Sequence, residues 1–161
     1  MDAVTIIHVI ISLLGIVSGY IVIAGMLQAQ RLPRWTAFFL ITTVLTSATG
    51  FAFPFVKLLP SHILAVLSLI ALAIAIYALY SRKLAGRWRS TYVVTAIIAQ
   101  YFNVFVLIVQ AFQKLPQLKA LAPTQTEPPF AIAQAVNLVA FLLLGYMATK
   151  RFQPENVHAS L

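Results

Sequence analysis

Five long apolar stretches, separated by short polar links, make up most of this 161-residue chain. None of the five contains Asp, Glu, Lys or Arg, and they cover residues 4–28, 36–55, 62–80, 90–112 and 130–149. Because about 20 apolar residues in a helix span the core of a bilayer, each stretch predicts a transmembrane helix. We expect an all-α fold, a polytopic integral membrane bundle of five transmembrane helices. The bundle is expected to form one domain over residues 1–151, followed by a short cytoplasmic tail at 152–161.

Composition supports a chain that is surrounded by lipid. It is 61% hydrophobic and 9% charged, whereas soluble domains carry about 25% charged residues. The net charge of +8 comes from basic residues that lie between the apolar stretches. Membrane topology explains such residues, so the lipid bilayer is the expected partner and nucleic acid is not. The chain has no cysteine, which excludes thiol–disulfide chemistry and cysteine ligation of iron–sulfur clusters.

The distribution of Lys and Arg predicts which way the helices run. With five spans, three basic residues fall on the side of the N-terminus and eight on the side of the C-terminus. The three are Lys57, Lys114 and Lys119; the eight are Arg31, Arg34, Arg82, Lys83, Arg87, Arg89, Lys150 and Arg151. Since cytoplasmic links carry the excess of Lys and Arg, we expect the N-terminus outside and the C-terminus in the cytoplasm.

A stripe of small and polar residues follows the first predicted helix. His8, Ser12, Gly15 and Gly19 recur at intervals of four and three residues, which places them on one helix face. Gly15 and Gly19 form a GxxxG pattern, which lets another helix approach closely. Helix packing is therefore the first explanation for the glycines. The alternative is that they leave space for a planar ligand below His8.

Two histidines are predicted at the same face of the membrane. His8 lies near the start of the first helix, and His62 opens the third helix. Imidazoles at similar depth on neighbouring helices can ligate haem iron or another metal. One alternative function is thus a redox protein that holds haem b between His8 and His62. The competing explanation is an interfacial histidine next to Ser61, a good helix-capping residue.

Side-chain amides follow one face of each of the last two predicted helices. Gln100, Asn103 and Gln110 lie on the fourth helix, and Gln134 and Asn137 lie on the fifth. Amides bond helices to one another in membranes, and helix packing is the role expected of Gln100 and Asn103. The alternative is a ligand-binding pocket in the outer half of the bundle, suited to a quinone, a lipid head group or the edge of a haem. Its expected members are His8, Ser12, His62, Gln110, Gln134 and Asn137.

The sequence lacks the residues of familiar catalytic sites. No catalytic triad, zinc-protease motif or phosphate-binding loop appears, and carriers that couple to ions need charges that the predicted spans do not have. We expect a non-catalytic protein that binds a hydrophobic ligand, or an accessory subunit of a larger membrane complex or homo-oligomer. A haem b redox protein and a small-solute carrier are the alternatives.

Four segments resemble a group of small bacterial inner-membrane proteins to which no activity is assigned. They are Thr42-Thr43-Val44-Leu45-Thr46-Ser47, Leu59-Pro60-Ser61-His62, Asn103-Val104-Phe105-Val106-Leu107 and Ala120-Leu121-Ala122-Pro123-Thr124-Gln125. The resemblance implies the bacterial cytoplasmic (inner) membrane and no particular function. Five spans in this length are also similar to the tryptophan-rich translocator proteins. The chain has only two tryptophans and lacks the Trp-Pro pattern of that family, so this second match is rejected.

The predicted orientation has a direct test. A reporter enzyme that is active only outside the cytoplasm should be inactive when it is fused after Leu161, because that end is expected in the cytoplasm. The same reporter fused within residues 113–129, the link expected outside, should be active. Activity of the C-terminal fusion would contradict the orientation.

Overall fold

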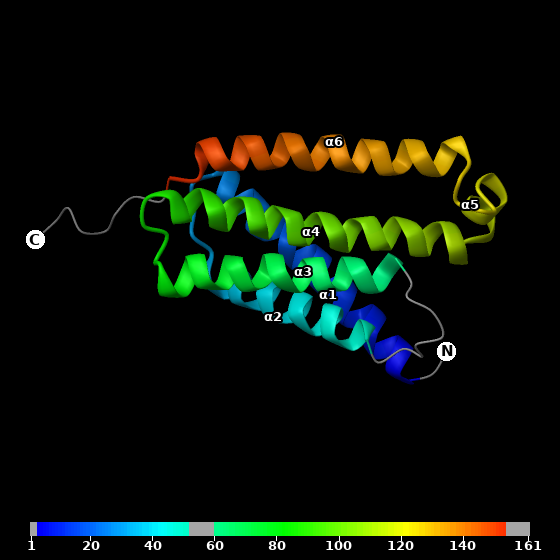
Figure 1. Ribbon diagram of the computed structural model, residues 1–161, viewed down its shortest axis with the longest axis horizontal. Helices are drawn as coiled ribbons and strands as arrows, with labels where there is room; N and C mark the ends of the chain where they lie inside the picture. The colour runs from blue at the N-terminus through cyan, green and yellow to red at the C-terminus, as the bar shows by residue number, and fades with distance from the viewer. Residues whose placement is uncertain (1–2, 52–59, 154–161) are drawn as a thin grey trace, which may run out of the picture.

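The computed structural model describes residues 3–51 and 60–153, and in this part of the chain every regular element is helical. Figure 1 shows the elements in chain order. They are α1 (Ala3–Leu27), α2 (Pro33–Gly50), α3 (Pro60–Ile76), the π-helical turn η1 (Tyr77–Ser81), α4 (Arg87–Lys114), α5 (Pro116–Leu121) and α6 (Pro128–Arg151). The predicted all-α class is therefore confirmed.

The long helices lie roughly along one axis and alternate in direction (Figure 1). One end of the bundle holds the start of α1, the end of α2 and the short helix α5. The other end holds the α1–α2 link, the η1–α4 link and the end of α6, and we call it the basic end. All of the following basic residues belong to it: Arg31, Arg34, Arg82, Lys83, Arg87, Arg89, Lys150 and Arg151.

Four helices are long and apolar enough to cross a membrane. They are α1, the α3–η1 helix over His62–Ser81, α4 and α6. Large apolar side chains cover their outer faces; on α6, Ile132, Val136 and Leu142 are 62%, 63% and 64% exposed. Water does not solvate such a surface well, so these helices indicate a membrane protein.

The fifth predicted span, over residues 36–55, is not confirmed. Its described part coincides with α2, which has 18 residues and begins at Pro33. This helix includes Arg34 in its first turn and several hydroxyl side chains, among them Thr42, Thr43 and Thr46, which lower its hydropathy. Residues 52–55 of the predicted span lie outside the described residues.

The centre of the bundle is a close contact between α1 and α4. The Gln100 side chain is fully buried, and its Nε2 donates a hydrogen bond of 2.8 Å to the Ile16 carbonyl oxygen. The amide lies in the space that a side chain on Gly19 would fill, because a Cβ there would lie 2.2 Å from Gln100 Oε1. On the same face of α1, a Cβ on Gly15 would meet the hydroxyl oxygens of Thr42 and Thr43 at 3.4 Å.

Aromatic rings join α6 to the rest of the bundle. Phe141 packs against Tyr101 of α4 and Tyr20 of α1, with ring centroids 5.9 and 6.2 Å apart. One turn further along α6, Gly145 lies against Ile97. These contacts cover only one side of α6, and its other faces remain open to the surroundings.

Hydrogen bonds to Glu127 stabilise the link between α4 and α6. Its carboxylate accepts hydrogen bonds from the Thr124 hydroxyl at 2.9 Å and from the backbone N–H groups of Thr124 and Thr126 at 3.2 and 3.1 Å. Desolvation alone would raise the pKa of the Glu127 carboxyl, but these hydrogen bonds outweigh it and hold the pKa below its ordinary value. The long link is thus locally ordered just before α6 begins.

The contact at Gly19 predicts that an added methyl group destabilises the protein more at Gly19 than at Gly50. Gly19→Ala should lower the melting temperature in mild detergent, because overpacking a tight contact costs about 1–3 kcal/mol. Gly50→Ala is the matched control, because a Cβ at Gly50 meets nothing within 4 Å. Equal melting temperatures for the two variants would contradict the close approach of α1 and α4.

Candidate functional site

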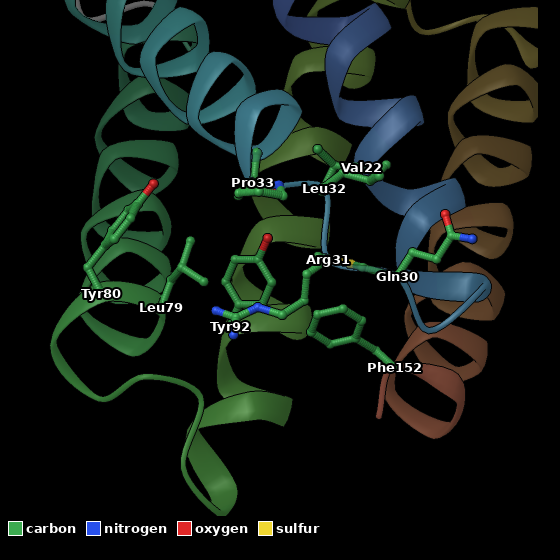
Figure 2. Close-up of a pocket in the computed structure, with 11 residues that line it drawn as sticks. Val22, Gln30, Arg31, Leu32, Pro33, Leu79, Tyr80, Tyr92 and Phe152 are labelled. Atoms are coloured by element: carbon green, nitrogen blue, oxygen red, sulfur yellow. The ribbon is translucent and has the colours of Figure 1, made fainter. Parts of the chain in front are cut away.

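A cavity of about 90 Å³ lies at the basic end, between the α1–α2 link, η1, α4 and the residues that follow α6 (Figure 2). Apolar side chains form part of its wall, among them Val22, Met26 and Phe152. The other part is polar. Its polar side chains are Gln30, Arg31, Thr36, Tyr80 and Tyr92.

The α1–α2 link is folded back so that Arg31 reaches this cavity. The backbone N–H of Gln30 donates to the Gly25 carbonyl at 2.8 Å, and Ala29 adopts a positive φ of 57°. Leu32 then packs onto α1 at Gly25, where a Cβ would lie only 2.7 Å from Leu32 Cδ1. The missing side chain at Gly25 therefore permits the tight return of the chain.

Tyr92 of α4 is the fixed polar group of the cavity. Its side chain is 2% exposed, and its hydroxyl shares a hydrogen bond with that of Thr36. It lies within electrostatic range of Arg31 and Tyr80. In Figure 2 the Arg31 side chain extends from the α1–α2 link towards Tyr92.

Phe152 closes one side of the cavity. It is 3% exposed, and its ring packs on Tyr92 with centroids 6.0 Å apart. Its backbone N–H donates to the Ala148 carbonyl at 2.8 Å, and its own carbonyl accepts a hydrogen bond from Arg89. Phe152, the residue that follows α6, is thereby held against the start of α4.

The opposite side of the cavity is formed by the π-helical turn η1. The N–H of Arg82 donates to the Tyr77 carbonyl at 3.0 Å, a bond between residues that are five positions apart. Trp88 holds this turn, because Tyr77 packs against it edge-on at 5.2 Å and the Arg82 guanidinium lies over its ring at 5.2 Å. Single π turns in helices occur frequently at functional sites, and this one carries Tyr80.

An apolar groove of about 340 Å³ leads away from Tyr80 between α2 and α3. It is lined by Ala37, Leu40, Ile41, Val44, Leu45, Ile76 and Tyr80. Tyr80 thus lines both the cavity and the groove. A polar cavity and an apolar groove that share one lining side chain offer the two parts that an amphiphile needs, a place for a head group and a place for a chain.

The charge around the cavity is positive. Glu127 is the only carboxylate side chain in the part of the chain that the structure describes, and it lies at the other end of the bundle. Arg31 lines the cavity, and Arg34 and Arg82 are close in sequence to the lining residues Pro33 and Tyr80. An anion is therefore favoured there over a cation.

The histidines and Ser12 lie at the end of the bundle opposite the cavity. His8 Nδ1 is 2.8 Å from the Thr49 hydroxyl, and the Ser12 hydroxyl donates to the His8 carbonyl at 2.7 Å. His62 is 5% exposed and stacks on Phe51 with centroids 6.0 Å apart. Both histidines thus lie beside the end of α2, and haem ligation by the pair stays a prediction. In the described residues no group of three or more His, Cys, Asp or Glu could hold a metal.

The other members of the predicted pocket lie on α4 and α6. Gln134 Nε2 donates to the Phe105 carbonyl at 3.2 Å, whereas Gln134 Oε1 and Asn137 Nδ2 are buried without a hydrogen-bond partner among the described residues. Gln110 is partly buried on α4. Joint binding of one ligand by His8, Ser12, His62, Gln110, Gln134 and Asn137 stays a prediction.

Gln100 and Asn103, expected to pack helices, connect α4 to two neighbours. Gln100 bonds to α1 as described above, and Asn103 Nδ2 donates to the Thr43 hydroxyl of α2 at 3.2 Å. Gln100 Oε1 is buried without a partner among the described residues.

Sequence reasoning missed the cavity at the basic end. Its polar groups come from four separate segments, and Arg31 already had a sufficient explanation in membrane topology. The available signal was the pair Tyr77 and Tyr80, the polar residues at the end of an otherwise apolar stretch.

Comparisons with known proteins found no matching family model, no matching curated protein and no matching solved structure.

Asn137 Nδ2, which has no hydrogen-bond partner among the described residues, predicts a reversed effect of mutation. Asn137→Leu should leave the melting temperature in detergent unchanged or raise it, because a buried donor without a partner costs about 1–3 kcal/mol. Asn103→Leu is the matched control and should lose about 0.6–2 kcal/mol, since it removes a hydrogen bond between helices. If Asn137→Leu instead lowers stability, its amide has a partner such as bound water or a ligand, which would favour the pocket predicted from sequence.

Proposed function

We propose that this protein is a non-catalytic integral membrane protein that binds an amphiphilic ligand at its basic end. The observation that carries the proposal is the position of Tyr80, which lines both the polar cavity and the apolar groove. A ligand placed there has its head group in the cavity and its chain in the groove. The residues lining the cavity provide hydrogen-bonding and cationic groups but no acid–base pair for catalysis.

The proposal includes a topology in which all five long helices, α2 included, cross the bacterial inner membrane. The N-terminus lies outside, and the basic end lies at the cytoplasmic surface. Eight Lys and Arg residues at that end support this orientation, because cytoplasmic links carry the excess of basic residues. Trp35 and Tyr80 are 45% and 56% exposed near that end, as aromatic residues at a membrane–water interface commonly are.

The dimensions favour a ligand that is mostly embedded in the bilayer. Binding sites for whole drug-sized molecules have volumes of about 300–1,000 Å³, and the cavity of about 90 Å³ is far smaller. It suits a head group alone. The groove is open along α2, where Ile41 and Leu45 are 58% and 44% exposed, so a chain that lies in it also contacts the surrounding lipid.

Native mass spectrometry from mild detergent tests the proposal. Added phospholipid should bind to the wild-type protein, and Ala37→Phe should reduce that binding about tenfold or more by filling the groove. Each buried CH₂ contributes about 0.8 kcal/mol, so displacing two of them already accounts for a tenfold change.

Ala48→Phe is the matched control, because Ala48 lies on the same helix, is exposed and does not line the groove. Melting temperatures show whether each variant is folded. If folded Ala37→Phe protein binds phospholipid as well as the Ala48→Phe protein, the groove is not the binding site and the proposal fails.

A further inference from the structure

We infer that the ligand is a phospholipid with a net negative head group and that Arg31 binds its phosphate and favours its net negative charge. The inference rests on the proposed function and adds the charge class of the ligand and the residue that recognises it. It joins three features of the basic end: the position of Arg31, its positive charge, and the small volume of the cavity.

Arg31 is placed to face a head group in the cavity. The tight return of the chain folds the α1–α2 link onto α1 at Gly25, and the Arg31 side chain extends towards Tyr92 of α4 in Figure 2. The two groups interact electrostatically. A guanidinium donates two parallel hydrogen bonds to a phosphate, which gives geometric selectivity as well as attraction. Tyr80, which lines both the cavity and the groove, carries a further hydroxyl donor.

The small volume of the cavity suits a compact group such as a phosphate. At about 90 Å³ it is far smaller than sites that enclose whole drug-sized ligands, which have about 300–1,000 Å³. A phosphate attached to a lipid glycerol fits this space, with the acyl chain continuing past Tyr80 into the apolar groove.

The start of α2 adds a weaker attraction for anions. Leu32 precedes the helix and has no side-chain acceptor for its free N–H groups, and Leu32 and Pro33 both line the cavity. The free N–H groups and the helix dipole make this end of α2 partly positive.

The positive charge in the cavity wall distinguishes anionic lipids from zwitterionic ones. Both kinds carry a phosphate, but a zwitterionic head group adds an ammonium, which Arg31 in the cavity wall would repel. Among the described residues no carboxylate lies at the basic end to offset this repulsion. The charges of the described residues therefore favour a net negative head group.

The test compares phosphatidylglycerol with phosphatidylcholine of identical acyl chains, each added to purified full-length protein and measured by native mass spectrometry. Wild-type protein should bind phosphatidylglycerol about tenfold more tightly, because its head group lacks the ammonium that Arg31 would repel. Arg31→Gln should weaken the binding of both lipids, since both carry a phosphate, and should weaken phosphatidylglycerol binding more, so that the preference falls to threefold or less. Arg34→Gln, the same charge change three residues away on a side chain that does not line the cavity, should keep the preference.

The possible outcomes distinguish a failure of the charge inference from a failure of the proposed function. Equal binding of the two lipids by wild-type protein overturns the charge inference but leaves the proposed function standing. Binding of neither lipid overturns the proposed function itself. Equal losses for Arg31→Gln and Arg34→Gln would show that overall surface charge attracts the lipid, and would overturn the role of Arg31. Melting temperatures close to wild type establish that both variants are folded.

Discussion

The burial of the Gln100 amide against Gly19 is the contact on which the rest of the bundle depends. It fixes the distance between α1 and α4 and, through the hydrogen bond to the Ile16 carbonyl, their register. Since α1 and α4 run in opposite directions (Figure 1), eight residues back along α4 from Gln100 correspond to about 12 Å further along α1. That step places Tyr92 of α4 beside Val22 and Met26 of α1, which together line the cavity at the basic end. The position of the candidate site is thus a consequence of a contact in the middle of the bundle.

The four helices that are long and apolar enough to cross a membrane were predictable because their signal is local. A long run of apolar residues without charges predicts a membrane-spanning helix by itself, whichever helices it packs against. The second predicted span is less distinct, since α2 combines Arg34 with threonines whose hydroxyls bond within the helix, as Thr42 does to the Phe38 carbonyl at 2.7 Å. The hydroxyls of Thr42 and Thr49 lower the hydropathy of α2 although both donate to carbonyl oxygens of the same helix.

The candidate site was not predictable by the same route, because it depends on contacts between distant segments. The GxxxG pattern indicates that some helix packs closely at Gly15 and Gly19, but nothing local indicates that Gln100 fills the space at Gly19 or that Thr42 and Thr43 face Gly15. The histidines and amides drew attention to the other end of the bundle because polar residues in apolar stretches are conspicuous. Arg31, in a link where basic residues are expected, was not.

We assign Arg31 two functions in the proposed protein, and both act on the same side of the membrane. Basic residues in a cytoplasmic link orient the helices during insertion. That function requires only that they are positively charged and lie on the cytoplasmic side. Recognition of a phosphate requires in addition that the link be folded, and here the fold comes from Gly25, the hydrogen bond of Gln30 and the packing of Leu32. Orientation is shared among eight basic residues and tolerates the loss of one, whereas Arg31 is the only basic residue among those that line the described cavity. A change at Arg31 is therefore expected to separate the two functions, with loss of lipid selectivity and retention of topology.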